Sequence, residues 1–391
     1  MGPVRRTPLA VRRRAVGLSQ DGLAQALGVE RSTVLRWEAG KTAPQPWVRP
    51  VLAQKLQVSD EQLDDLLRPD DEEGESVDRR AFAGLATALA LAPIARARMG
   101  SQIGAIQVLQ LHKRTARLRR LDDHLGGMDT YQVYLSEMAA TEKLIKTASY
   151  SSATARALTG VLAEQAQMAG WAAFDAGRYT DSRRHYRSAL SAARESGDPG
   201  LEGNSLAFIA YENADSQVAA ESTRVAEAGA GTTPRVRALL HERLAWAYAV
   251  AGQASAAARA LDHAVAAVNE PSHAPEPDWV FWVDPLEIDI MTGRCFTELR
   301  RPARAIPVLE DALSRYDDTH ARDKALYSTW LAHALLDANE PERAATVTEQ
   351  ALDLASGVGS IRPGERLRGV LRRLSHHGGP EVAAVLERAR G

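Results

Sequence analysis

The sequence is poor in cysteine and in long apolar runs, and each absence excludes a class of protein. Cys295 is the only cysteine among 391 residues, so no disulfide can form within the chain. A chain without a disulfide framework suits a reducing compartment, and we expect the protein in the cytoplasm. A lone cysteine is more often a small buried apolar residue than a reactive thiol, and we expect the same of Cys295.

The apolar stretch between Phe82 and Pro93 is too short to cross a membrane. Its apolar run is about fifteen residues long, whereas a transmembrane helix needs about 20. The preceding pair, Arg79 and Arg80, looks like a twin-arginine export signal, but it lies some eighty residues into the chain. We therefore predict a buried or dimer-forming helix here, and no membrane partner.

Motifs of catalytic chemistry are also missing from the sequence. His241-Glu242 lacks the second histidine of a zinc-protease helix, and His376-His377 has no third ligand nearby. We find no phosphate-binding loop, no dinucleotide fingerprint and no serine in a nucleophile elbow. We therefore predict that the protein is not an enzyme and uses no metal and no cofactor.

What the sequence does contain favours a helical protein of two or three domains. Hydrophobic residues make up 45% and charged residues 25%, which is ordinary for a folded protein. Alanine, leucine and arginine are abundant, whereas runs of β-branched residues are scarce. This composition predicts an all-α fold.

The formal net charge of −2 hides a separation of charge along the chain. Residues 1–56 hold ten lysines and arginines against three acidic residues, a net charge of +7. Residues 57–78 hold one basic residue against ten acidic ones, a net charge of −9. A basic segment of this size is typical of a DNA-binding domain, and the acidic run at 70–75 indicates a solvated linker after it.

The stretch from Leu18 to Lys41 has the pattern of two short helices joined by a tight turn. Ser19 suits the start of the first helix, because its hydroxyl can accept a free backbone N–H of the first turn. Gly28 suits the end, where a residue tolerant of positive φ is favoured. The second helix begins near Glu30 and is expected to point three side chains inward: Val34, Leu35 and Trp37.

This stretch resembles the DNA-binding domain of the phage-repressor-like (XRE) family. The resemblance covers residues 8–67 and rests on the order Leu18-Ser19-Gln20, Leu23-Ala24, Leu27-Gly28-Val29, Ser32-Thr33-Val34, Trp37-Glu38 and Gly40-Lys41. It implies a five-helix domain whose second short helix lies in the major groove of double-stranded DNA. Ser59, with Gln62 three residues later, matches a capping box at the start of the fifth helix.

The resemblance also implies roles for single residues. The residues facing base edges are Arg31, Ser32 and Arg36, and those gripping phosphates are Gln20, Thr33 and Lys41. In some family members an arginine of the first helix pairs with a glutamate at the end of the recognition helix, and Arg13 and Glu38 stand at these positions. The alternative is a structural helix unit without DNA binding, and the retained basic residues argue against it.

From residue 152 onward the chain repeats. When it is aligned on positions 177, 214, 252, 300 and 339, three columns hold only small residues. Seven before these anchors are Gly170, Ala207, Ala245, Gly293 and Ala332; five after are Ser182, Ala219, Ala257, Ala305 and Ala344; twelve after are Ala189, Ala226, Ala264, Ala312 and Ala351. Small residues let paired helices approach closely, and this register resembles tetratricopeptide repeats, with a loop insertion at 271–278.

The resemblance to tetratricopeptide repeats implies a concave groove lined by the first helix of each pair. Six residues before the anchors are Trp171, Phe208, Trp246, Arg294 and His333, and ten before are Gln167, Asn204, Glu242, Ile290 and Thr329. An aromatic row beside a polar row suits an extended peptide. Packing between repeats explains both rows equally well, and it is the expected role of Trp279 and Trp282.

We therefore predict three parts: a helix-turn-helix domain at 1–68, an acidic linker with connecting helices at 69–150, and a tetratricopeptide-repeat superhelix with C-terminal capping helices at 151–391. The expected function is sequence-specific transcription regulation by a homodimer whose repeats dimerise, sense a peptide or other ligand, or both. The architecture resembles peptide-sensing quorum regulators, and the composition resembles regulators of actinobacteria. The alternatives are a protein-interaction scaffold tethered to DNA and a small-molecule-sensing regulator.

Overall fold

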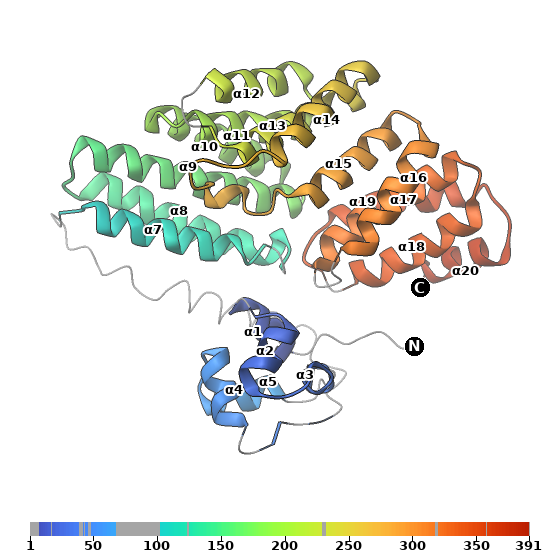
Figure 1. Ribbon diagram of the computed structural model, residues 1–391, viewed down its shortest axis with the longest axis horizontal. Coiled ribbons are helices and arrows are strands. Elements are labelled where there is room, and N and C mark those ends of the chain that lie inside the picture. Colours follow the sequence, from blue (N-terminus) through green and yellow to red (C-terminus); the bar gives the residue numbers. More distant parts are fainter. Residues whose placement is uncertain are drawn as a thin grey trace. The chain divides into compact units, whose positions relative to one another are not determined.

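The computed structural model describes residues 8–16, 18–38, 42, 44–45, 48–67, 102–122, 125–228, 232–316, 320–356 and 358–390. Among them, an isolated bridge between Gln102 and Ser149 is the only β-type pairing, and the regular structure is otherwise helical. The predicted all-α fold is confirmed. The chain divides into two compact units, Met1–Ala92 and Pro93–Gly391, which are described separately (Figure 1). Lys41, the acidic run at 70–75 and the apolar stretch at 82–93 lie outside the described residues.

Five short helices form the first unit: α1 (Pro8–Ala15), α2 (Gln20–Leu27), α3 (Arg31–Glu38), α4 (Arg49–Leu56) and α5 (Asp60–Leu67). The predicted local signals are present at their ends. Ser19 Oγ accepts from Gly22 N at 2.8 Å, and Gly28 closes α2 with a φ of 66°. Ser59 and Gln62 make both hydrogen bonds of the capping box, at 3.0 and 3.2 Å. These caps fix the turn between α2 and α3 and the start of α5.

The core of the first unit joins all five helices around α3. Its fully buried members are leucines of α1, α2, α4 and α5 together with one valine of α3: Leu9, Leu23, Val34, Leu52, Leu56 and Leu63. The predicted pair between Arg13 and Glu38 lies beside this core, with Arg13 Nε donating to Glu38 Oε1 at 2.6 Å. The side chain of Arg13 is 2% exposed and that of Glu38 is 6% exposed. The end of α3 is thus tied to α1 by a buried charge pair.

Leu35 differs from its prediction. It was expected to point inward, but 51% of it is exposed. The buried residues of α3 are Val34, Trp37 and Glu38, which recur at the three- and four-residue spacing of one helix face. Leu35 is adjacent to Val34 in sequence and therefore turned about 100° away from it, because an α-helix has about 3.6 residues per turn. It lies one turn after Arg31, on the solvent side.

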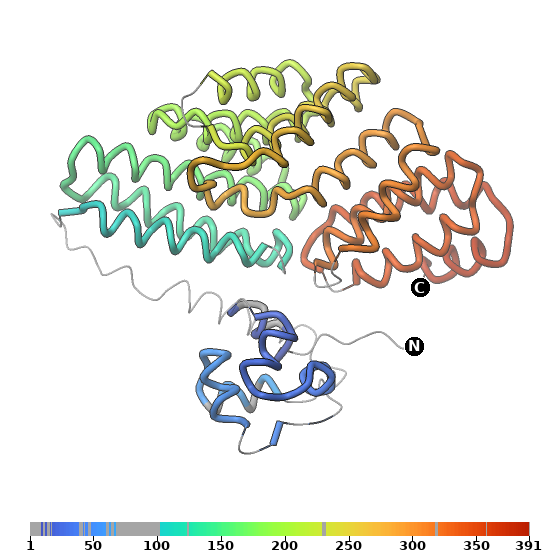
Figure 2. The backbone as a smooth tube through the Cα atoms, viewed as in Figure 1, coloured from blue at the N-terminus to red at the C-terminus, as the bar shows by residue number. Residues whose placement is uncertain are grey.

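The second unit is an array of antiparallel helix pairs, which follow one another in chain order (Figure 2). The array begins with α7 (Ala105–Arg119) and α8 (Gly127–Thr147), both of which pack on the next helix, α9. Six pairs follow: α9 (Ser152–Asp175) with α10 (Tyr179–Ser196), α11 (Pro199–Asn213) with α12 (Ser216–Ala228), α13 (Pro234–Val250) with α14 (Ala254–Val268), α15 (Pro285–Glu298) with α16 (Pro302–Arg315), α17 (Ala321–Asp337) with α18 (Pro341–Ala355), and α19 (Arg362–Leu374) with α20 (Pro380–Arg388).

The five repeat anchors all lie in the turn between the helices of a pair, and all adopt a positive φ. The values are 75° at Gly177, 50° at Ala214, 72° at Gly252, 54° at Arg300 and 59° at Asn339. A left-handed residue at this point ends the first helix and lets the second fold back against it. The repeat alignment therefore located a common turn geometry, even where glycine is absent.

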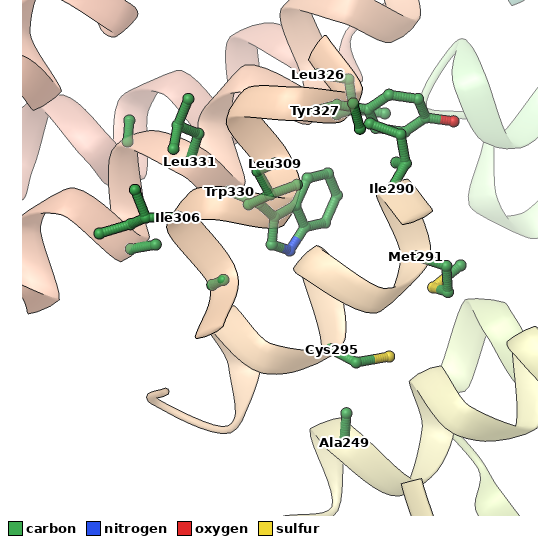
Figure 3. Packing of buried hydrophobic residues seen from close by; sticks show 14 of the residues in the cluster. Ala249, Ile290, Met291, Cys295, Ile306, Leu309, Leu326, Tyr327, Trp330 and Leu331 are labelled. Atoms are coloured by element: carbon green, nitrogen blue, oxygen red, sulfur yellow. The ribbon is translucent and has the colours of Figure 1, made fainter. Parts of the chain in front are cut away.

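Small residues of the three aligned columns lie buried between the paired helices. At Gly293 an added methyl group would overlap the side chain of Leu309, so this position requires glycine for α15 and α16 to approach. Larger apolar residues fill the space between successive pairs. Figure 3 shows part of this core, where side chains of α13, α15, α16 and α17 meet around Trp330 and Leu309. Cys295 is fully buried there, as predicted.

Three contacts join parts of the second unit that are far apart in sequence. The segment between α14 and α15, which contains a short 3-10 helix (η1, Asp278–Val280), runs back to α7, where Asp278 pairs with Arg120 at 2.7 Å (Figure 2). The turn between α7 and α8 meets the far end of the array, with Met128 N donating to Gly359 O at 2.9 Å. Arg322, at the start of α17, pairs with Asp122 at 3.0 Å. The inner face is thus enclosed by contacts between distant parts of the second unit.

Candidate nucleic-acid interface and ligand cavity

The exposed side of α3 carries two arginines, a serine and a leucine. The side chain of Arg31 is 65% exposed, and its Nε lies 3.9 Å from Asp21 Oδ2. Ser32 Oγ donates to Glu30 Oε2 at 3.2 Å, and Arg36 Nη2 donates to Thr33 Oγ1 at 3.1 Å. These contacts are on the surface and weak enough to be exchanged for contacts to a ligand. The three residues predicted to face base edges therefore stand together on one accessible surface.

A chain of polar contacts holds this surface in place. Gln20 Nε2 donates to Glu38 Oε2 at 2.6 Å, while Gln20 Oε1 accepts from Arg31 Nε at 3.4 Å. Glu38 in turn accepts from Arg13, so α1, α2 and α3 are joined through one carboxylate. In the structure, the amide of Gln20, which was predicted to grip phosphate, is thus engaged with α3. Thr33 is half-buried, and Lys41 lies outside the described residues.

The second unit encloses a cavity of about 450 Å³ on its inner face. Drug-sized ligands bind in cavities of roughly 300–1,000 Å³. The chain has 21 aromatic residues of the phenylalanine, tryptophan and tyrosine types, and nine line this cavity: Tyr134, Trp171, Phe208, Tyr211, Trp279, Phe281, Trp282, Tyr316 and Tyr327. An aromatic-poor chain has therefore gathered nearly half of its aromatic rings in one place.

Four of the six residues predicted for a ligand groove line the cavity, namely Gln167, Trp171, Asn204 and Phe208. Glu242 and Trp246 lie buried behind the wall, where Trp246 packs edge-to-face on Trp330 with ring centres 5.8 Å apart. Asn204 Nδ2 donates to Gln167 Oε1 at 2.8 Å, and Gln167 Nε2 donates to Leu201 O at 3.2 Å and to Ser205 Oγ at 2.9 Å. Trp279 and Trp282, expected as core, reach the cavity from the η1 segment.

Six arginines line the cavity, and they fall into two groups. Three are each paired with two carboxylates: Arg119 with Glu164 and Asp278, Arg315 with Asp289 and Asp311, and Arg322 with Asp122 and Asp323. These three join neighbouring elements as structural ion pairs. The other three, Arg243, Arg294 and Arg362, come from α13, α15 and α19 and surround Tyr211 instead.

Tyr211 is the centre of the second group. Its phenolic oxygen accepts from Arg294 Nη2 at 2.8 Å and from Arg362 Nη2 at 3.1 Å. The guanidinium of Arg243 lies over the tyrosine ring, 4.7 Å from its centre. Burial alone would raise the pKa of Tyr211, but the charges of Arg294, Arg362 and Arg243 outweigh burial and lower it to about 8.

Glu287 completes the electrostatics of the cavity wall. It lies on α15, and both of its carboxyl oxygens accept from Tyr327 Oη, at 3.1 and 3.3 Å. Burial raises the pKa of Glu287 to about 8, and the neighbouring carboxyl of Glu242 adds to the effect. Burial likewise raises the pKa of Glu242, whose two oxygens have no hydrogen-bond donor among the described residues. At neutral pH these two acids supply less negative charge than their number suggests.

Reasoning from the sequence missed Tyr211, Arg243, Glu287 and Arg362. Tyr211 had a detectable signal, because it lies three residues after Phe208 and seven after Asn204, on the same helix face. Arg362 had none, since it lies 151 residues beyond Tyr211 and reaches it only through the closure of the array.

The described residues show neither a metal centre nor a membrane segment. None of their histidine, cysteine and acidic side chains form a group of three or more that could hold a metal ion. Of the helices described, none combines the length and the apolar character that a bilayer-spanning segment requires.

Comparison with known proteins identifies the first unit. A family model described as a helix-turn-helix domain matches residues 8–66, which span α1 to α4 and nearly all of α5. No curated protein matches the chain. The chain therefore carries a helix-turn-helix domain of the DNA-binding type.

Proposed function

We propose that the protein is a sequence-specific transcription regulator that binds DNA through α3 and a small organic ligand through the cavity of its second unit. The observation that carries the proposal is the combination of the two surfaces in one chain. The first unit matches a helix-turn-helix domain and exposes Arg31, Ser32 and Arg36. The second encloses an aromatic cavity of ligand size. A ligand that binds one conformation of the second unit more tightly shifts the population of the chain and so its affinity for DNA.

On DNA, we assign base reading to the exposed side of α3. An arginine can give two parallel hydrogen bonds to guanine, worth roughly 1–3 kcal/mol of discrimination. Leu35 adds an apolar group that suits the methyl group of thymine. Gln20, Thr33 and Lys41 are assigned to the phosphate backbone, where contacts set the register of the protein but read no sequence. Gln20 would release its contact with Arg31 when both bind DNA.

The repeats are proposed to be tetratricopeptide-like and to hold the protein as a homodimer. Two helix-turn-helix domains then bind a pseudo-palindrome whose half-sites lie one helical turn, or a multiple of it, apart. A mass measurement by light scattering, with and without operator DNA, tests this part. A monomer under both conditions would refute the dimer and leave the assignment of α3 intact.

A small ligand is favoured over an extended peptide by two features of the inner face. The cavity of about 450 Å³ has the size that suits a compact organic molecule, whereas an extended peptide needs a long groove. The side-chain NH2 groups of Gln167 and Asn204 are engaged within the wall, with Leu201 O, Ser205 Oγ and Gln167 Oε1, which reduces the donors left for a peptide backbone. A protein scaffold would require an open concave surface for the same reason.

The experiment that tests DNA reading is selection of binding sites from random DNA by the full-length protein. It should yield an enriched sequence that contains guanines. Arg31→Ala and Arg36→Ala should then weaken the selected site more than scrambled DNA, whereas Lys41→Ala should weaken both about equally and flatten the salt dependence. Recovery of no enriched sequence, or equal losses on all DNA for Arg31→Ala, would contradict the proposed reading role.

A further inference from the structure

One part of the cavity wall carries more positive than negative charge: the three arginines around Tyr211. Arg294 and Arg362 both donate to the oxygen of Tyr211, at 2.8 and 3.1 Å, and Arg243 stacks on its ring. A neutral phenol can accept these hydrogen bonds but cannot neutralise guanidinium charge. Buried charges are costly unless paired, so three cations around one phenol call for a counter-charge.

The carboxylates near this group supply it only in part. Arg243 Nε lies 3.2 Å from Glu242 Oε1, and Arg362 Nη1 lies 3.8 Å from Asp175 Oδ1. Asp175 is already engaged by Gly127 N and Ser360 Oγ. Arg294 forms no ion pair with any described residue. By comparison, each of the other three cavity arginines has two carboxylates within 4.0 Å. The arginines around Tyr211 have at most one each.

Aromatic faces adjoin the guanidinium groups of Arg243 and Arg362. Arg362 lies 4.7 Å from the ring centre of Trp171, and Arg243 lies 5.5 Å from that of Trp282. Trp171 also contacts Phe208, with ring centres 6.0 Å apart. Arg294 also lines the cavity, but its guanidinium lies over the rings of Trp246 and Trp330, at 4.6 and 4.3 Å, which are not part of the cavity wall. Of the three arginines around Tyr211, Arg243 and Arg362 are therefore the two that adjoin tryptophan rings of the wall. Flat apolar walls beside two accessible cations match a flat apolar molecule with one negative group.

We propose that the cavity binds an aromatic organic anion, with its negative group at Arg243 and Arg362 and its ring against Trp171, Phe208 and Trp282. This inference rests on the proposed ligand-binding function of the second unit and names the chemical class of its ligand. A carboxylate of a one- or two-ring compound fits, because guanidinium groups bind carboxylates through charge-assisted hydrogen bonds. A ring compound without a charge would bring no counter-charge to the two guanidinium groups, and the site would therefore select against it.

The test uses two competitors that differ only in charge. Full-length protein is titrated with 8-anilinonaphthalene-1-sulfonate, an aromatic anion whose fluorescence rises on binding. The bound dye is then displaced with 1-naphthoate or with the neutral 1-naphthamide. We expect one dye per chain, and displacement by naphthoate at a concentration at least tenfold lower than by naphthamide.

Three arginine variants locate the site. Arg243→Met and Arg362→Met should each weaken naphthoate at least tenfold and leave naphthamide nearly unchanged. Arg315→Met is the matched control, because this arginine also lines the cavity but is 46% exposed and paired with two aspartates. It should alter neither competitor. Circular dichroism and melting temperature check that each variant is folded, and Arg362→Lys serves in place of Arg362→Met if the latter unfolds.

Several outcomes would overturn the inference: no dye binding, equal potency of the two competitors, or unchanged naphthoate affinity in folded Arg243→Met. Selection of DNA sites by the same protein is measured separately. If that selection succeeds while the charge preference is absent, the ligand class is wrong and the DNA-binding function stands. If the protein prefers naphthoate to naphthamide but selects no DNA site, the ligand class stands and the DNA-binding function is wrong.

Discussion

Single side chains set the charge of both functional surfaces. In the first unit, Glu38 accepts from Arg13 and Gln20 and so fixes the recognition helix. In the second, Tyr211 brings two arginines from distant helices to one oxygen. Each of these centres leads to a prediction that single substitutions can check.

Arg13→Ala should unfold the first unit far more easily than a surface substitution does. It leaves Glu38 buried without its cation, and breaking a buried pair in this way costs about 3–5 kcal/mol. Differential scanning calorimetry of the full-length protein measures the loss in the transition of the first unit. Arg31→Ala, on the exposed side of α3, is the control and should change stability by less than about 0.5 kcal/mol. Equal stability of the two variants would show that the Arg13–Glu38 pair is absent in solution.

Affinity for an aromatic anion should fall as the pH rises from 7 to 9. Tyr211, with a pKa of about 8, and Glu287, with a pKa of about 8, are both neutral at the lower pH and become negative as the pH passes 8. Each new negative charge competes with the ligand for the same arginines. Naphthoate is ionised throughout this range, so the change comes from the protein. Displacement of the dye at pH 7, 8 and 9 measures it.

The surroundings of both groups are consistent with this direction. Tyr211, on α11, is faced by Arg243, Arg294 and Arg362 from three other helices, and by the uncharged rings of Trp171 and Phe174 from α9. Glu287 is faced by Glu242 and Arg243 of α13, by Arg294 of its own helix, and by Asp323 and Tyr327 of α17. Tyr211→Phe should reduce the pH dependence, since only Glu287 then titrates. An affinity independent of pH would contradict the charge model of the cavity.

The sequence correctly predicted the roles of residues that act on their near neighbours in the chain, such as helix caps. Ser19, Gly28 and the Ser59–Gln62 box act within four residues, and their hydrogen bonds and backbone angles are as predicted. Leu35 was assigned inward because it is apolar, but the helix period places it outside. An apolar side chain that faces solvent breaks the usual pattern, and composition alone cannot distinguish such a residue from a core residue.

At the scale of helices, the repeat anchors explain how pairs form without a strict glycine rule. Ala214, Arg300 and Asn339 adopt the left-handed conformation that Gly177 and Gly252 adopt with less strain. The three small-residue columns were readable from the sequence because each lies at a fixed distance from its anchor. The helices α7 and α8 have no such register, and their place in the array follows from contacts with α9 that no local pattern encodes.

Ala214→Gly should stabilise the second unit by about 0.5–1 kcal/mol. An L-residue pays roughly 1–2 kcal/mol in the left-handed region, while glycine costs about 0.5–1 kcal/mol more chain entropy on folding. The melting temperature of the variant measures the gain. Ala251→Gly is the control, because Ala251 precedes the anchor Gly252 with an ordinary φ of −76°. It should bring no gain, and a gain of the same size there would show that conformation at the anchor is not the cause.

Gly293→Ala should destabilise the second unit by about 1–3 kcal/mol, the usual cost of overfilling a packed core. The added methyl group would overlap Leu309 and push α15 and α16 apart. Gly364→Ala, where an added methyl group meets no atom, is the matched control in α19 and should be neutral or slightly stabilising. The melting temperatures of both variants test this prediction. Equal values would show that α15 and α16 accommodate the added methyl group without loss of stability.

At the scale of the whole molecule, the cavity depends on contacts between residues far apart in sequence. Asp122 meets Arg322, and Met128 meets Gly359. The repeat period predicts that pairs stack, but the small rotation between successive pairs decides where the ends of the array meet. That rotation results from many side-chain contacts, so the cavity was not predictable from the repeat spacing. The spacing did point to four residues that line it, Gln167, Trp171, Asn204 and Phe208.

The two units should unfold in two separate thermal transitions, because each has its own core and the chain divides between them at Ala92. Differential scanning calorimetry of the full-length protein should show both. Arg13→Ala should lower only the transition of the first unit. Naphthoate at about 100 times its dissociation constant should stabilise only the second, by about 2.7 kcal/mol, since a ligand stabilises the part of the chain that it binds. A single transition that both changes move together would show that the units unfold as one body, and DNA binding and ligand binding would then be coupled through stability itself.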